Sequence, residues 1–141
     1  MAGKTLDQWL TEYSRSHCNR INRAIHTLCV PAILFAIVAL AWDVHAFELR
    51  VAYLVMILVA PFYLRLGWKA SGVMAVEFLI CVLILSVWPH GLPLRPTAAG
   101  LFGVAWVGQF IGHAIEGQRP KFLQDMTFLL IGPIWVVMKS A

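Results

Sequence analysis

The chain has 141 residues, of which 60% are hydrophobic and only 13% are charged. A soluble domain is roughly 45–50% apolar and about 25% charged, so this composition indicates an integral membrane protein. The net charge of +4 comes without a dense basic patch interleaved with aromatic residues, so we expect no nucleic-acid partner. The three cysteines form no CxxC pair, which argues against a disulfide framework or a zinc knuckle.

The first predicted element is a short amphipathic helix over residues 4–16. Thr5 and Gln8 have the spacing of a capping box. Apolar side chains recur at helical spacing at Leu6, Trp9, Leu10 and Tyr13. Such a helix either lies in the membrane interface or packs on the bundle, and the sequence allows both.

Longer apolar runs follow, and each is a predicted membrane span. They lie near residues 24–42, 50–66, 71–88 and 97–116. A crossing takes about 20 residues, with a range of about 17–25. A final run, 126–138, reaches only about 20 Å at ~1.5 Å per residue, which is short of a core of about 30 Å. We read that run as a half-helix or interfacial segment, broken near Gly132 and Pro133.

These runs predict an all-α fold, a multi-pass transmembrane helix bundle. About four helices span the membrane, with a short C-terminal half-helix and the N-terminal amphipathic helix beside them. We expect residues 1–141 to form a single membrane-embedded domain.

The basic residues orient the spans. With the N-terminus in the cytoplasm, only Arg50 and Arg95 among the loop residues face outward. The others face inward: Lys4, Arg15, Arg20, Arg23, Arg65, Lys69, Arg119 and Lys121. This is a strong positive-inside bias. Four crossings return the chain to the cytoplasm, so the start of the first span and the end of the fourth lie at the same face.

Two polar clusters lie at those two ends, where ionisable side chains are costly and usually mark a functional site. One runs over residues 17–26 and the other over residues 109–120. The side chains that can converge are His17, Asn22, His26, His113 and Glu116.

Helical spacing places the polar side chains of each cluster on one face. Asn22 and His26 are four residues apart, and Gln109, His113 and Glu116 follow at i, i+4 and i+7. We interpret the imidazoles, with or without the carboxylate, as a metal site. Asn22 and Gln109 would then be hydrogen-bond partners that hold the ligands.

The kind of metal follows from the ligand types. Imidazole suits Fe, Zn, Cu or Ni, and two His with one carboxylate and open positions suit non-haem Fe(II). The alternative is that the histidines only form hydrogen bonds between helices. Cys18, beside His17, is a less favoured ligand because free cysteines commonly just pack. His45 and His90 are expected in loops of the opposite face and are left out of the site.

Other residues near the clusters have assignable roles. Tyr13 precedes His17 by one turn and either orients it or anchors the helix in the interface. Gly108 and Gly112 form a small-xxx-small pattern that lets another helix approach closely. Basic residues at this face either hold a lipid carboxylate or phosphate or reflect the positive-inside bias alone.

The residues of both clusters resemble the motifs of a known family, the yeast-type 2-hydroxy fatty acid dioxygenases. The first motif is similar to His17-x-Asn19-x-x-Asn22-x-x-x-His26-x-x-x-x-Pro31. The second is similar to Trp106-x-x-Gln109-Phe110-Ile111-Gly112-His113, followed by Glu116, Pro120 and Gly132-Pro133. The Glu-Gly-x-x-Pro ending and the tail over residues 128–135 look like the bacterial branch. Arg20 stands where family members often have Pro.

The resemblance implies a membrane enzyme that depends on Fe(II) (Fe2+) and O₂ and shortens long-chain 2-hydroxy fatty acids by one carbon. Together with the two polar clusters, the resemblance implies that the metal ligands are His17, His26 and His113. The expected catalytic residues are these three histidines and Glu116. The expected residues for the substrate head group are Arg23, Arg119 and Lys121.

The expected location is a bacterial inner membrane, with the site at its cytoplasmic face and membrane lipid as a partner; an oligomer is left open. Two other functions fit the same residues. One is a non-catalytic lipid-binding or scaffold protein. The other is a zinc-dependent membrane hydrolase with Glu116 as its base.

Overall fold

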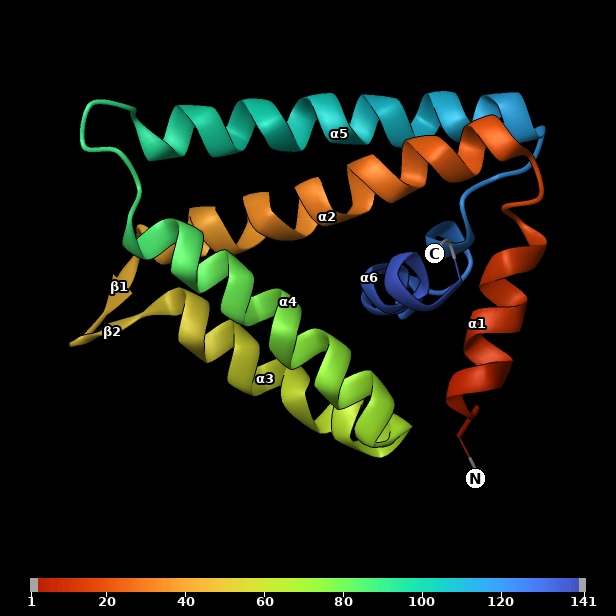
Figure 1. Cartoon of the computed structure of the whole chain (residues 1–141), viewed down its shortest axis with the longest axis horizontal. Coiled ribbons are helices and arrows are strands. Elements are labelled where there is room, and N and C mark those ends of the chain that lie inside the picture. Colours follow the sequence, from red (N-terminus) through yellow and green to blue (C-terminus); the bar gives the residue numbers. More distant parts are fainter. Residues whose placement is uncertain (1–2, 140–141) are drawn as a thin grey trace. The chain divides into compact units, whose positions relative to one another are not determined.

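A computed structural model describes residues 3–139 of the chain (Figure 1). The helices and strands are α1 (Leu6–Arg15), α2 (Arg20–Trp42), β1 (His45–Ala46), β2 (Leu49–Arg50), α3 (Val51–Leu66), α4 (Trp68–Ser86), α5 (Leu94–Glu116), η1 (Lys121–Leu123) and α6 (Phe128–Lys139). The chain divides into two compact units, one of residues 1–31 with 104–141 and the other of residues 32–103. The single domain over 1–141 stays a prediction.

Three helices, α2, α4 and α5, are long and apolar enough to cross a membrane. Two apolar helices are shorter: α3, at the second predicted span, has 16 residues, and α6, at the final run that was not expected to cross, has 12. Each of the four predicted spans is therefore helical. The three long apolar helices indicate a membrane protein. The count of four crossings stays a prediction. The all-α expectation misses one small feature, the antiparallel pairing of β1 with β2.

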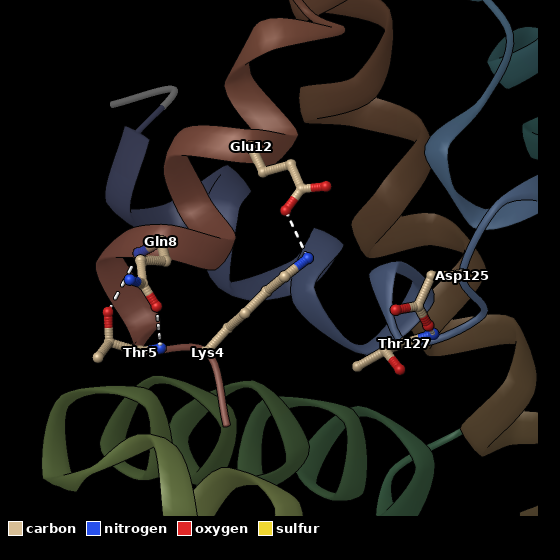
Figure 2. A network of polar contacts seen from close by, with 6 residues as sticks. All are labelled: Lys4, Thr5, Gln8, Glu12, Asp125 and Thr127. Atoms are coloured by element: carbon tan, nitrogen blue, oxygen red, sulfur yellow. Dashed lines mark hydrogen bonds and ion pairs between the residues drawn. The ribbon is translucent and has the colours of Figure 1, made fainter. Parts of the chain in front are cut away.

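Helix α1 begins as its sequence predicts. The Thr5 side chain accepts from the Gln8 backbone N–H at 3.3 Å, and the Gln8 side chain accepts from the Thr5 N–H at 2.9 Å (Figure 2). The same view shows the Lys4 ammonium beside the Glu12 carboxylate, 2.6 Å apart. The capping box of Thr5 and Gln8 satisfies backbone N–H groups that have no partner within the first turn of the helix.

The apolar face of α1 packs against α6. The Trp9 ring meets the Phe128 ring edge-on at 5.0 Å, and Tyr13 lies 5.1 Å from Trp135. Of the two alternatives for this helix, the structure therefore selects packing within the protein.

Helix α6 is continuous, so the predicted break near Gly132 and Pro133 is wrong. Pro133 lies inside the helix, where the apolar surroundings outweigh one lost hydrogen bond. Close packing explains why glycine occupies position 132. A Cβ there would lie 3.2 Å from the Tyr13 hydroxyl and 3.4 Å from Val30. The missing side chain lets α6 lie close to α1 and α2.

In the unit of residues 32–103, α3 and α4 lie side by side (Figure 1). A single residue, Gly67, joins them and has φ 104°, a conformation that favours glycine. The core of this unit consists of Val38, Ala39, Trp42, Ala52, Cys81, Leu85 and Ala98. Large aliphatic side chains such as Leu58, at 80% exposure, cover the outside of these helices, as lipid contact requires.

Candidate metal centre

Three histidines from separate parts of the chain converge in the unit of residues 1–31 and 104–141. His17 lies between α1 and α2, His26 lies in the second turn of α2, and His113 lies in the last turn of α5. One ring nitrogen of each lies within 4.8 Å of the others, and all three side chains are buried. The ring centroids are 4.3 Å apart for His17 and His26, 4.8 Å for His26 and His113, and 5.1 Å for His17 and His113.

Backbone carbonyls set the tautomers of two of these rings. The Nδ1 atom of His17 lies 2.7 Å from the Tyr13 carbonyl oxygen, and the Nδ1 atom of His26 lies 3.0 Å from the Asn22 carbonyl oxygen. A carbonyl oxygen can only accept, so each Nδ1 carries the hydrogen of the neutral ring. The Nε2 atom of each ring then keeps its lone pair, which is the arrangement of a metal-binding imidazole held by a hydrogen bond.

The histidines also leave polar atoms without partners. His17 Nε2 and His113 Nδ1 are buried and make no hydrogen bond within the described residues. Burial lowers the pKa of His17 to about 4, against a smaller opposing effect of its hydrogen bond to Tyr13, so the ring is neutral near pH 7. A buried polar atom without a partner is costly. A metal ion bound by these lone pairs removes that cost, so the donor set fits a metal.

Aromatic rings hold His17 in place. The Tyr13 ring stacks on it with centroids 4.3 Å apart and planes 6° apart, and Trp135 lies 5.0 Å away. The Trp135 indole N–H donates to the Ser14 hydroxyl at 2.8 Å, which ties α6 to α1 beside the site. Tyr13 therefore orients His17, the first of its two predicted roles. Trp135 and the fully buried Ser16, whose hydroxyl lies 3.2 Å from His17 Nδ1, were not predicted as site residues.

Glu116 joins the two polar clusters. Its carboxylate accepts from the backbone N–H of Cys18 at 3.0 Å and of Asn19 at 2.9 Å, and from the Asn22 amide at 2.9 Å. It thereby holds the end of α5 against the start of α2, where a negative charge also suits the helix dipole. The three-histidine group does not include it. Its contacts connect the ends of the two helices that carry His26 and His113.

The close approach of α2 and α5 uses both glycines of the predicted small-xxx-small pattern. A Cβ on Gly108 would lie 2.7 Å from the Cys29 sulfur, and a Cβ on Gly112 would lie 2.4 Å from the Asn22 side-chain oxygen. Those distances are too short for any side chain, so the prediction of a close helix approach is confirmed.

The two predicted hydrogen-bond partners of the ligands behave differently. Asn22 contacts His26 through its backbone carbonyl, and its side-chain amide donates to Glu116 instead. Gln109 is buried one turn before His113 but forms no hydrogen bond to the histidines within the described chain.

Three basic residues were predicted to bind the substrate head group. Arg23 donates to the Lys139 carbonyl oxygen at 3.1 Å and lies over the Trp135 ring. Arg119 is exposed, and the half-buried Lys121 begins η1.

Three other ligand-type side chains stay outside the group. Cys18 is exposed, and its thiol faces the Arg15 carbonyl oxygen at 3.4 Å. His45 and His90 are exposed and belong to the unit of residues 32–103, as their exclusion from the site predicted.

Comparison with known proteins points to one family. The profile described as 2-hydroxy-palmitic acid dioxygenase Mpo1-like matches residues 3–140. The 2-hydroxy-palmitic acid dioxygenase MPO1 of Saccharomyces cerevisiae is 28% identical over 129 residues, which covers 89% of this chain and 73% of the yeast protein. No solved structure matches the chain. The match over almost the whole chain shows that the protein belongs to the Mpo1-like 2-hydroxy-palmitic acid dioxygenase family.

Proposed function

We propose that this protein is an Fe(II)-dependent dioxygenase that shortens 2-hydroxy fatty acids by one carbon with O₂. The observation that carries the proposal is the buried group of His17, His26 and His113, within 4.8 Å of one another, in a member of this family. The yeast relative's name supplies the substrate class, a long-chain 2-hydroxy acid.

The proposed reaction balances without a further reductant. A 2-hydroxy acid, R–CH(OH)–COOH, and O₂ give R–COOH, CO₂ and water. The bond between the carboxyl carbon and the hydroxylated carbon breaks, and the hydroxylated carbon becomes the new carboxyl carbon. The substrate loses four electrons, and one O₂ takes up four.

The residues of the site have distinct roles in this proposal. His17, His26 and His113 would hold Fe(II), which when bound supplies the Lewis acidity and redox chemistry needed for O₂ to react. Carbonyl groups of Tyr13 and Asn22 keep the Nε2 lone pairs of two ligands directed away from the backbone. Glu116 keeps the two helix ends together, and the aromatic rings beside His17 exclude water from that side.

Basic side chains near the site would attract the anionic head group. Arg119 and Lys121 follow the end of α5 and form no ion pair within the part of the chain that the structure describes. Arg23 is partly committed, because it already contacts the end of α6. This attraction acts over long range and should weaken as salt is added. The acyl tail would lie among the apolar helices.

Glu116 also separates the proposal from the zinc hydrolase. Three histidines also suit catalytic zinc, which would need a nearby base to activate water. The Glu116 carboxylate already accepts three hydrogen bonds, so it is poorly placed to take a proton. This observation favours the dioxygenase.

We also propose that α2, α3, α4 and α5 all cross the membrane within a single domain of residues 1–141, with the site at the cytoplasmic face. Helix α3 has 16 residues, about 24 Å at ~1.5 Å per residue, so it needs local thinning of the bilayer or extended flanks to cross. Helix α6 is shorter still and would not cross. A bacterial inner membrane fits this arrangement.

Reporter fusions test the membrane arrangement. A fusion at residue 45 or 92 is expected to report the outer side, and a fusion near residue 68 the cytoplasm, because basic residues are concentrated in the inner loops. A cytoplasmic signal at residues 45 and 92, with an outer signal near 68, would contradict the arrangement and the cytoplasmic site.

An assay with purified protein tests the reaction. Fe(II), O₂ and 2-hydroxypalmitate are supplied, and we expect the acid with 15 carbons as product, with none from the His113→Ala variant. Bound zinc without O₂ consumption would favour the hydrolase. Bound lipid without iron or product would favour the lipid-binding protein.

A further inference from the structure

Gln109 is a largely buried residue beside the site, and its amide has no hydrogen-bond partner among the described residues. It lies in α5, is only 7% exposed, and forms no hydrogen bond with any described residue. The fully buried polar atoms without a partner in this site belong to His17, Asn22 and His113, so the Gln109 amide keeps some accessible surface. An accessible amide without a partner in the described chain is free to bind a ligand through its N–H groups and its carbonyl oxygen.

Helix geometry places this amide next to the metal centre. Gln109 and His113 are four residues apart on one face of α5, which puts their Cβ atoms about 5–6 Å apart. Both side chains tilt towards the N-terminus of α5, so they remain one helical turn apart on the same face. In the proposed membrane arrangement Gln109 is one turn closer to the membrane core than His113, on the side from which a substrate with its tail in the apolar region would approach.

The chemistry of an amide matches one feature of the proposed substrate. An amide has two N–H donors and one carbonyl acceptor. A 2-hydroxy acid has a carboxylate that accepts and, on the next carbon, a hydroxyl that donates. An unsubstituted fatty acid lacks the hydroxyl and leaves the amide oxygen without a partner. A site built to bond a hydroxyl group discriminates strongly against an analogue that lacks it.

We propose that Gln109 binds the head group of the 2-hydroxy acid, with its N–H donating to the carboxylate and its Oε1 accepting from the 2-hydroxyl. Gln109 is then the residue that selects 2-hydroxy acids over unsubstituted fatty acids of the same length. This inference rests on the proposed function and adds a specificity residue to it.

Equilibrium binding to the iron-loaded protein without O₂ tests the inference, because no turnover then occurs. Wild type is expected to bind 2-hydroxypalmitate more tightly than palmitate. The Gln109→Met variant keeps the length of the side chain and removes the amide. It should lose about tenfold or more of that preference, because 2-hydroxypalmitate loses two hydrogen bonds and palmitate only the one to its carboxylate, with iron content close to wild type. Gln118→Met, at an exposed position just beyond α5, is the matched control and should leave the preference unchanged.

A second variant keeps the test decisive if Gln109→Met folds poorly. Gln109→Glu keeps the size and one acceptor but places a carboxylate against that of the substrate, so both acids should bind more weakly while iron is retained. Wild-type preference in Gln109→Met, or equal binding of the two acids by wild type, would overturn the inference. In the first case the reaction assay still gives product, so the proposed function stands. If wild type forms no product, the proposed function fails and this inference falls with it.

Discussion

Alanine in place of His17, His26 or His113 is expected to remove most of the bound iron and all measurable product. Each substitution takes away one of three ligands in a site where no other described His, Cys or carboxylate joins the group. Loss of a residue that only supports a ligand typically costs about 10–100-fold in metal affinity, so loss of a ligand should cost at least that. Iron per protein, measured after anaerobic purification, checks this prediction.

The chain contains its own controls for the histidine variants. His45→Ala and His90→Ala alter exposed residues of the other unit and should leave both iron and product near wild type. Circular dichroism of each variant confirms that the helices persist. Unchanged iron in all three ligand variants would mean that the metal, if any, binds elsewhere.

Gly112→Ala is expected to disrupt the same site through the backbone. A Cβ at this position would lie 2.4 Å from the Asn22 side-chain oxygen and 3.5 Å from the His26 ring. Asn22 has little freedom to move, because its amide donates to Glu116 and its carbonyl holds His26. Overpacking of this kind costs about 1–3 kcal/mol. We expect a lower Tm together with weaker iron binding.

Another glycine of α5 provides the control. A Cβ on Gly103 would meet nothing within 4 Å, so Gly103→Ala should be neutral or stabilise the helix by about 0.5–1 kcal/mol. Thermal unfolding and iron content of the two variants are compared under the same detergent conditions. Equal Tm and equal iron for Gly112→Ala and wild type would show that α2 and α5 approach less closely than described.

Sequence reasoning predicted most of what depends on local periodicity. The capping box of Thr5 and Gln8, the helices at all predicted runs, and the shared faces of the two polar clusters follow from residue spacing along one helix. The meeting of His26 with His113 also followed, because the distribution of basic residues placed both helix ends at the same side of the membrane.

Two local features differ from the sequence predictions: the continuity of α6 through Pro133 and the pairing of β1 with β2. Pro133 does not end α6, because the segment is packed against other helices that stabilise it as one unit. The pairing of β1 with β2 follows from a tight turn with Phe47 at φ 57°, a conformation for which an aromatic residue gives no signal.

The tertiary structure alone decided which group each polar side chain contacts. Spacing put Glu116 and Gln109 on the face of His113, and predicted Glu116 as a possible ligand or ordering partner and Gln109 as a hydrogen-bond partner of the ligands. The folded chain instead gives the Glu116 carboxylate three donors at or just before the start of α2, and gives the Gln109 amide no partner among the described residues. The physical reason is that helical periodicity determines only the direction of a side chain. Its hydrogen bonds depend on atoms brought close by residues nearly a hundred positions away.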